Sequence, residues 1–127
     1  MNHSPEFLAI VADAKSRVAE ITVAAYIELE DAGTRSILID VREESEWAAG
    51  HAAGATHIGK GIIERDIETC VPDKGATLVL YCGGGYRSAL AADAIRRMGY
   101  SNVLSLAGGW RAWTEAGLPT VSQTSAK

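Results

Sequence analysis

One segment of the chain combines the residue types that nucleophilic sulfur chemistry needs. Cys82 follows an apolar run and precedes three consecutive glycines, and Arg87 and Ser88 stand at the start of an alanine-rich stretch. Glycine adopts positive φ freely, so successive N–H groups can point at one centre, and a following helix N-terminus adds more. The pattern predicts an anion cradle that favours the thiolate of Cys82. Gly84→Val should damage this cradle, because a β-branched residue resists positive φ.

The polar and aromatic side chains of the loop have predicted roles of their own. Arg87 either binds the anion directly or braces the loop by bonding carbonyls or a carboxylate such as Asp40. Ser88 lies in the cradle or only caps the helix. Tyr86 is expected at the exposed tip, at the mouth of the site. The predicted binding set is Gly83, Gly84, Gly85, Tyr86, Arg87 and Ser88.

The hydrophobic pattern places this loop between a strand and a helix. Ser36–Asp40 and Thr77–Tyr81 are apolar runs without polar alternation, which is typical of strands buried on both faces of a parallel sheet. Ligand sites in such sheets lie beyond the carboxyl ends of the strands, where Cys82 falls. Weaker strand candidates are Thr56–Ile58 and Val103–Leu106, and helices are expected over Pro5–Ala19, from Thr22 to near Gly33, and over Glu43–Ala49, Ser88–Met98 and Trp110–Ala116. The alternation predicts an α/β fold, an open parallel sheet of about four or five strands with helices on both faces.

Composition limits the classes of protein to consider. The 127 residues suffice for one domain, expected over 21–119, after a helical extension at 1–20 and before a flexible tail at 120–127. The net charge of −4 argues against nucleic acid as a partner. No apolar run approaches the length of a membrane span, and two cysteines are too few for a secreted disulfide scaffold. We therefore expect a cytoplasmic protein with no membrane partner.

Three motifs, in the expected order, resemble those of rhodanese-type sulfurtransferases. Cys82 and Arg87, separated by four residues, resemble the active-site loop of that family. The family's N-terminal motif is matched by Asp40-Val41-Arg42, Glu46-Trp47 and Gly50-His51-Ala52, in which Ala52 replaces the usual isoleucine. The C-terminal motif is matched by Gly108-Gly109-Trp110-Arg111-Ala112-Trp113 and Gly117-Leu118-Pro119. The resemblance covers the chain from about Ile21 to Pro119.

This resemblance implies a rhodanese-like fold and a covalent mechanism. The Cys82 thiolate would attack thiosulfate or another sulfane-sulfur donor, release sulfite and become a persulfide, and a thiol, cyanide or a protein would accept the sulfur. No metal or organic cofactor is implied. Asp40 and Arg42 are expected to be a structural pair. The alternative is a sulfur-relay or protein-interaction module with little small-molecule turnover. The oligomeric state stays open, and the N-terminal helix either packs on the domain or forms an interface with a second copy or a partner.

Two phosphate-related hypotheses compete with sulfur transfer. Members of the family that hydrolyse phosphate esters have a loop one residue longer, and a wider ring suits a tetrahedral phosphate better than a single sulfur. The segment from Gly54 to Lys60 matches most of a phosphate-binding P-loop. Gly61 stands where that motif needs a metal-binding hydroxyl, so we do not predict a nucleotide site.

The remaining candidates lie outside the loop. Lys60 and Arg65 follow a predicted strand and are candidates for attracting an anionic substrate, although a solvated surface charge is the simpler interpretation. His51, His57 and Cys70 lack the spacing of known zinc ligand sets. We expect Cys70 to be a bystander, with the formation of a disulfide with an oxidised Cys82 as its alternative role.

Overall fold

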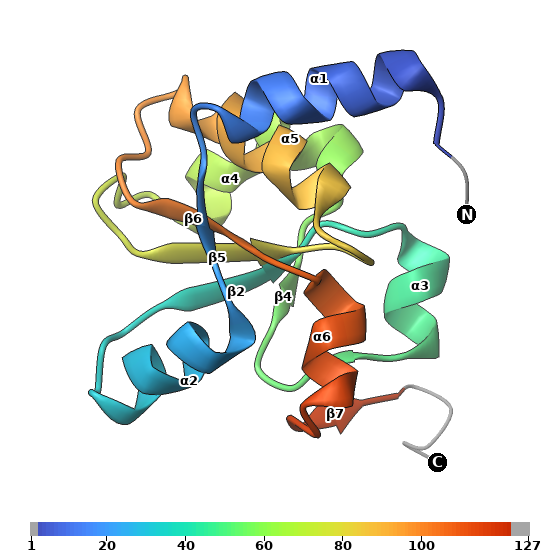
Figure 1. Cartoon of the computed structure of the whole chain (residues 1–127). Helices are drawn as coiled ribbons and strands as arrows, with labels where there is room; N and C mark the ends of the chain where they lie inside the picture. The colour runs from blue at the N-terminus through green and yellow to red at the C-terminus, as the bar shows by residue number, and fades with distance from the viewer. Residues whose placement is uncertain (1–2, 123–127) are drawn as a thin grey trace.

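A five-stranded parallel sheet forms the centre of the computed structural model, which describes residues 3–122 (Figure 1). The strand order is β1-β6-β5-β2-β4, and every neighbouring pair is parallel. These strands are β1 (Ala19–Ile21), β2 (Ile37–Asp40), β4 (Thr56–His57), β5 (Leu78–Tyr81) and β6 (Val103–Leu106). The predicted fold class is confirmed.

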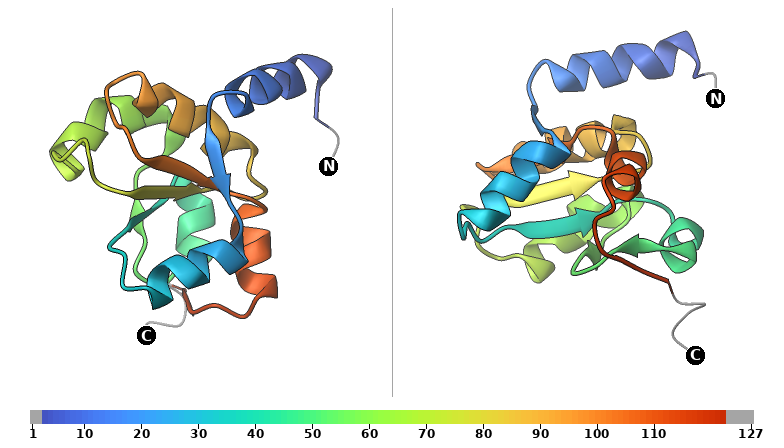
Figure 2. Two further views of the ribbon diagram at one scale, coloured as in Figure 1. Left: turned by 60° about the vertical axis from the view of Figure 1, so that its left-hand side comes forward. Right: turned by 60° about the horizontal axis from the view of Figure 1, so that its bottom comes forward.

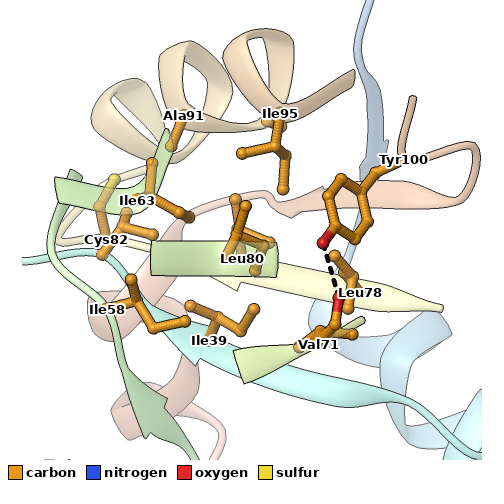
Figure 3. Packing of buried hydrophobic residues seen from close by; sticks show 13 residues of the cluster. Ile39, Ile58, Ile63, Val71, Leu78, Leu80, Cys82, Ala91, Ile95 and Tyr100 are labelled. Carbon is orange, nitrogen blue, oxygen red and sulfur yellow. Dashed lines mark hydrogen bonds between the residues drawn. The ribbon is translucent and has the colours of Figure 1, made fainter. Parts of the chain in front are cut away.

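The sheet is covered by helices on both faces, as predicted. Along β5, Leu78, Leu80 and Cys82 belong to one buried cluster, whereas Val79 and Tyr81 belong to the other, because strand side chains alternate between faces. Figure 3 shows the first cluster, in which β5 packs beneath residues of α4 and α5. The second cluster packs against α2 and α6. The helices are α1 (Pro5–Lys15), α2 (Val23–Asp31), α3 (Glu44–Ala49), α4 (Ile63–Cys70), α5 (Tyr86–Arg96) and α6 (Gly109–Glu115), with a 3₁₀ turn, η1, at Lys60–Ile62.

Local sequence signals explain where the first helices begin. The Ser4 hydroxyl accepts a hydrogen bond from the Phe7 N–H at 3.1 Å, and the Thr22 hydroxyl accepts one from the Ala25 N–H at 3.0 Å. Pro5 occupies the first helical position, where its missing N–H costs nothing. These caps fix the starts of α1 and α2 as the sequence predicts.

Several regular elements differ from the sequence prediction. The helix expected over Pro5–Ala19 ends at Lys15, and Ala19 begins β1, whose three residues pair with β6. This strand is too short to produce a recognisable pattern. Helix α4 was not predicted, because its first turn has no capping side chain and only Ile63 and Ile67 are buried in it. Their spacing of four residues is the signal that could have indicated a helix.

The end of the described chain also forms regular structure. β7 (Thr120–Val121) pairs antiparallel with β3 (His51–Ala52), so the first residues of the expected tail are held against the domain. The rest of that expected tail, residues 123–127, lies outside the described residues. Within residues 3–122, no helix has the length and apolar content needed to cross a bilayer.

Helix α1 packs along α5 on the outside of the domain (Figures 1 and 2). Val11 and Ala14 are the buried residues of α1. Just beyond its end, the Arg17 guanidinium donates to both carboxylate oxygens of Asp93, at 3.0 and 2.8 Å. This contact holds the pKa of Asp93 at about 2. Of the two placements considered for this helix, the structure shows the one packed on the domain.

Candidate functional site

The Cys82 thiol lies at the carboxyl end of β5, beneath the glycine loop. The side chain is buried, and its Sγ accepts a hydrogen bond from the Gly85 N–H at 3.1 Å. The thiol contacts the Ser88 hydroxyl at 3.4 Å, and that hydroxyl contacts the Ser105 hydroxyl of β6 at 2.8 Å. The sulfur therefore has two hydrogen-bonding partners, the N–H of Gly85 in the loop and the hydroxyl of Ser88 in α5. Ser88 lies inside α5 rather than at its cap, which is Gly85.

The three glycines do not share one conformational role. Only Gly85 among them has positive φ, at 105°, and this backbone geometry directs its N–H at the sulfur. At Gly83 a Cβ would lie 3.1 Å from the guanidinium of Arg87, so the end of that side chain would have to shift by a few tenths of an ångström. Gly84 is exposed, its φ is not positive, and a Cβ would meet no atom within 4 Å. The expectation that Gly84 needs positive φ is wrong, and the requirement falls on Gly85.

Arg87 is held by a carboxylate of α3. Its two terminal nitrogens donate to the two oxygens of Glu46 at 2.7 and 3.0 Å. This bidentate contact lowers the pKa of Glu46 to about 2. The geometry is that of a brace between the loop and α3, with Glu46 as the partner in place of the suggested Asp40.

Asp40 instead belongs to a buried network with Tyr81, which lies on the face of the sheet opposite to the Cys82 cluster. The Arg42 guanidinium donates to the Asp40 carboxylate at 2.8 Å and to the Gly50 carbonyl at 2.6 Å. The Tyr81 hydroxyl donates to the same carboxylate and accepts from the Ala52 N–H at 3.0 Å. Burial is the main reason why the pKa of Tyr81 is raised. This network fastens β2, β5 and the segment after α3 to one another.

Backbone N–H groups at the start of α6 bind two carbonyls of the loop, and the sequence does not predict this contact. The Trp110 N–H donates to the Cys82 carbonyl at 2.7 Å, and the Arg111 N–H donates to the Gly83 carbonyl at 3.2 Å. Gly109 must be a glycine here, because a Cβ would collide with the Cys82 carbonyl. The sequence presents the Gly108-Gly109 pair as part of the C-terminal motif, without a role in the loop. Its physical signal is a glycine pair one residue after a strand, which permits this close approach.

A cavity of about 750 Å³ opens over the sulfur. Its lining includes Cys82, Tyr86, Arg87 and Arg111, together with His3 and Phe7 from the N-terminal segment. Tyr86 lines this cavity, but it is half-buried in the first turn of α5 rather than at an exposed loop tip, because His3 and Phe7 lie against its ring. A substrate larger than a simple anion has room in this cavity.

The basic residues expected near the site lie elsewhere. Lys60 lines a separate cavity between α1 and α5. Arg65 is exposed and donates to Asp66 at 2.7 Å. Arg87 and Arg111 are the basic side chains that line the cavity over Cys82, among residues 3–122.

The alternative metal and redox residues are dispersed as well. His51 and His57 stack on the Trp47 ring, with centroids at 3.4 and 4.9 Å, and each bonds a backbone carbonyl. The described part of the chain contains no group of three or more His, Cys, Asp or Glu residues that could hold a metal ion. Cys70 is exposed beside the residues that begin β2 and β5, at the end of the sheet opposite to Cys82.

Comparisons with known proteins agree with this geometry. The profile of the rhodanese-like domain family matches residues 22–116. The probable adenylyltransferase/sulfurtransferase MoeZ of Mycobacterium tuberculosis is 35% identical over 113 residues, which cover 87% of this chain and 29% of that protein. The thiosulfate sulfurtransferase PspE of Escherichia coli is 36% identical over 70 residues, or 55% of this chain and 67% of that protein. The chain thus spans less than a third of the length of the first of these relatives.

Two solved structures cover nearly the whole chain. A protein of Rhodopseudomonas palustris, described as a possible tyrosine phosphatase, has a TM-score of 0.81 at 29% identity and covers 94% of this chain and 96% of its own. The polysulfide-sulfur transferase homodimer of Wolinella succinogenes has a TM-score of 0.78 at 27% identity and covers 95% and 90%. With residues 22–116 matched and the cysteine loop in place, this chain belongs to the rhodanese-like domain family.

Proposed function

We propose that this protein is a sulfurtransferase that carries sulfur as a persulfide on Cys82. The donor would be thiosulfate or a similar sulfane-sulfur compound, and the acceptor cyanide, a thiol or a protein thiol. The observation that carries the proposal is the buried Cys82 sulfur at the base of an open cavity, with the Gly85 N–H directed at it. The 36% sequence identity with the thiosulfate sulfurtransferase PspE over 70 residues supports the same chemistry.

The proposed reaction proceeds in two covalent steps. The Cys82 thiolate attacks the outer sulfur of thiosulfate, the S–S bond of the donor breaks, and its electron pair leaves with sulfite. The acceptor nucleophile then attacks the terminal sulfur of the persulfide, and the electron pair of that S–S bond returns to Cys82 as thiolate. No net oxidant is consumed, and the cycle predicts ping-pong kinetics. A cytoplasmic location is part of the proposal, since both cysteines are free thiols and the cytoplasm keeps thiols reduced.

The surrounding groups would stabilise the charge on sulfur at each step. The Gly85 N–H is a fixed donor at the sulfur and requires no reorganisation when the anion forms. The Ser88 hydroxyl, which accepts from the thiol, would turn to donate to the thiolate. The start of α5 directs its positive end at the same point. Arg87, held by Glu46, presents its charge at the cavity wall, where it would orient an anionic donor.

Intact-protein mass spectrometry after incubation with thiosulfate tests the proposal. Wild type and Cys70→Ser should gain one sulfur atom, and Cys82→Ser should gain none. Cys70→Ser is the matched control, because Cys70 is the second free cysteine and lies at the far end of the sheet. No added sulfur with thiosulfate or with other sulfane donors would overturn the proposal. A persulfide that forms but passes to no small acceptor would instead favour the relay module.

Phosphate-ester hydrolysis is the second candidate function to measure. The similarity to the possible tyrosine phosphatase of Rhodopseudomonas palustris raises it. The four residues between Cys82 and Arg87 argue against it, because a smaller ring suits one sulfur better than a phosphate. We expect no release of nitrophenol from p-nitrophenyl phosphate by the protein that forms the persulfide.

A further inference from the structure

The N-terminal helix reaches the cavity over Cys82, although it lies outside the family match at residues 22–116. Its attachment does not depend on the residues that line the cavity. Val11 and Ala14 are 3% and 2% exposed beneath it, and Arg17 makes two hydrogen bonds with Asp93 of α5. Helix α1 is therefore a fixed addition to the wall of the site.

The part of this segment that faces the cavity is aromatic. The rings of His3 and Phe7 lie 5.2 Å apart, and the Tyr86 ring lies 5.0 Å from His3 and 6.1 Å from Phe7. The Lys15 ammonium lies over Tyr86, 5.2 Å from the ring centroid. His3, Phe7 and Tyr86, which we call the aromatic wall, all line the cavity that contains the Cys82 sulfur.

The Arg and Glu side chains of the lining carry no net charge that would favour one acceptor over another. Arg87 is paired with Glu46, and the other charged side chains of the lining, Arg111 and Glu115, have opposite signs. At about 750 Å³, the space is also much larger than cyanide or thiosulfate requires. The aromatic wall is then the feature by which the site can prefer one thiol over another, since contact with aromatic rings favours an apolar body.

We propose that the aromatic wall selects the sulfur acceptor and favours thiols that carry an apolar or aromatic body. This inference rests on the proposed function. The acceptor thiolate attacks the terminal sulfur of the Cys82 persulfide, the persulfide S–S bond breaks, and the acceptor leaves as its own persulfide while Cys82 is restored as thiolate. Phe7 contacts the part of the acceptor that does not react, and it is therefore a specificity-determining residue rather than a catalytic one.

The kinetic test compares two thiols of similar reactivity, 2-phenylethanethiol and 2-mercaptoethanol, with thiosulfate as donor. We expect Phe7→Ala to lower the ratio of their kcat/KM values about 3- to 10-fold, because one aromatic contact contributes about 0.5–1.5 kcal/mol. Leu8→Ala is the matched control, because Leu8 is the next residue of α1, is 42% exposed and does not line the cavity. An unchanged ratio in Phe7→Ala would overturn the proposal.

A binding measurement tests, without any sulfur transfer, whether the aromatic wall binds the apolar body of an acceptor. An NMR titration with 2-phenylethanol, which has the body of the acceptor but no thiol, should shift the signals of Phe7 and Tyr86. Phe7→Ala should raise the Kd for 2-phenylethanol about 3- to 10-fold, and Leu8→Ala should leave this Kd unchanged. Equal affinity in wild type and Phe7→Ala would overturn the inference. Binding without persulfide formation would support the aromatic wall and refute only the proposed function.

Discussion

Replacing Gly85 by alanine tests how the loop holds the Cys82 sulfur. Gly85 has φ 105° and ψ 0°, and an L-residue placed there would be strained by about 1–2 kcal/mol. The added Cβ would lie 3.4 Å from the Gly108 nitrogen, which is an ordinary van der Waals distance, so the cost comes from the backbone conformation. We therefore expect urea unfolding to show a loss of at least about 1 kcal/mol if the loop keeps its conformation.

The effect on activity depends on the direction of the Gly85 N–H. If the loop relaxes to relieve the strain, this N–H leaves the sulfur, at present 3.1 Å away. A hydrogen bond to a charged group contributes about 1.5–3 kcal/mol, which corresponds to a fall of about 10- to 150-fold in the rate of persulfide formation.

Stopped incubation with thiosulfate followed by mass spectrometry measures that rate, and Gly84→Ala is the matched control. A Cβ at Gly84 meets nothing within 4 Å and φ there is not positive, so this variant should form the persulfide at nearly the wild-type rate. Equal damage by the two substitutions would refute the reasoning, and so would a Gly85→Ala protein with wild-type stability and rate.

Two further predictions concern side chains that fasten the site to its surroundings. Glu46→Gln removes one charge from the pair with Arg87, and because these side chains are 35% and 31% exposed, urea unfolding should show a loss of about 1 kcal/mol or less at neutral pH. Since Arg87 lowers the pKa of Glu46 from 4.5 to about 2, this contribution is complete above 4.5 and disappears as the pH falls to about 2; a difference between wild type and variant that does not shrink there would contradict the pairing. Tyr81→Phe removes a buried partner of both Asp40 and the Ala52 N–H, and should cost about 1–3 kcal/mol in the same assay. A loss below about 0.5 kcal/mol would show that neither group depends on the hydroxyl.

Much of the fold was readable because its central strands are strongly patterned. β6 was predicted at its observed bounds, and β2 and β5 lie within their predicted apolar runs. Buried parallel strands need continuous apolar sequence, so they are conspicuous. β1 and α4 were missed because three residues of strand and a charged helix with two buried isoleucines have little pattern of their own. Their structure is decided by the neighbours on which they pack.

The candidate site likewise has a part that the local sequence predicts and a part that depends on distant residues. The order of cysteine, glycines and arginine is local, so it predicts Cys82 and its loop as the site without knowledge of the fold. The partners of that loop are distant in the sequence: Glu46 lies 41 residues before Arg87, and Ser105 lies 17 residues after Ser88. Only the folded sheet brings them together, so sequence reasoning offered Asp40 as a partner for Arg87 when the structure shows Glu46.

Three elements therefore fix the loop from three sides, and this has a consequence for its chemistry. The N–H groups at the start of α6 hold the carbonyls of Cys82 and Gly83, α3 holds Arg87 through Glu46, and β6 holds Ser88 through Ser105. A loop bound only at its two ends would close around a sulfur anion when the charge forms, and part of the binding energy would be lost in ordering it. Here the Gly85 N–H is directed at the sulfur before any donor binds, so its full electrostatic effect is available when negative charge develops on Cys82.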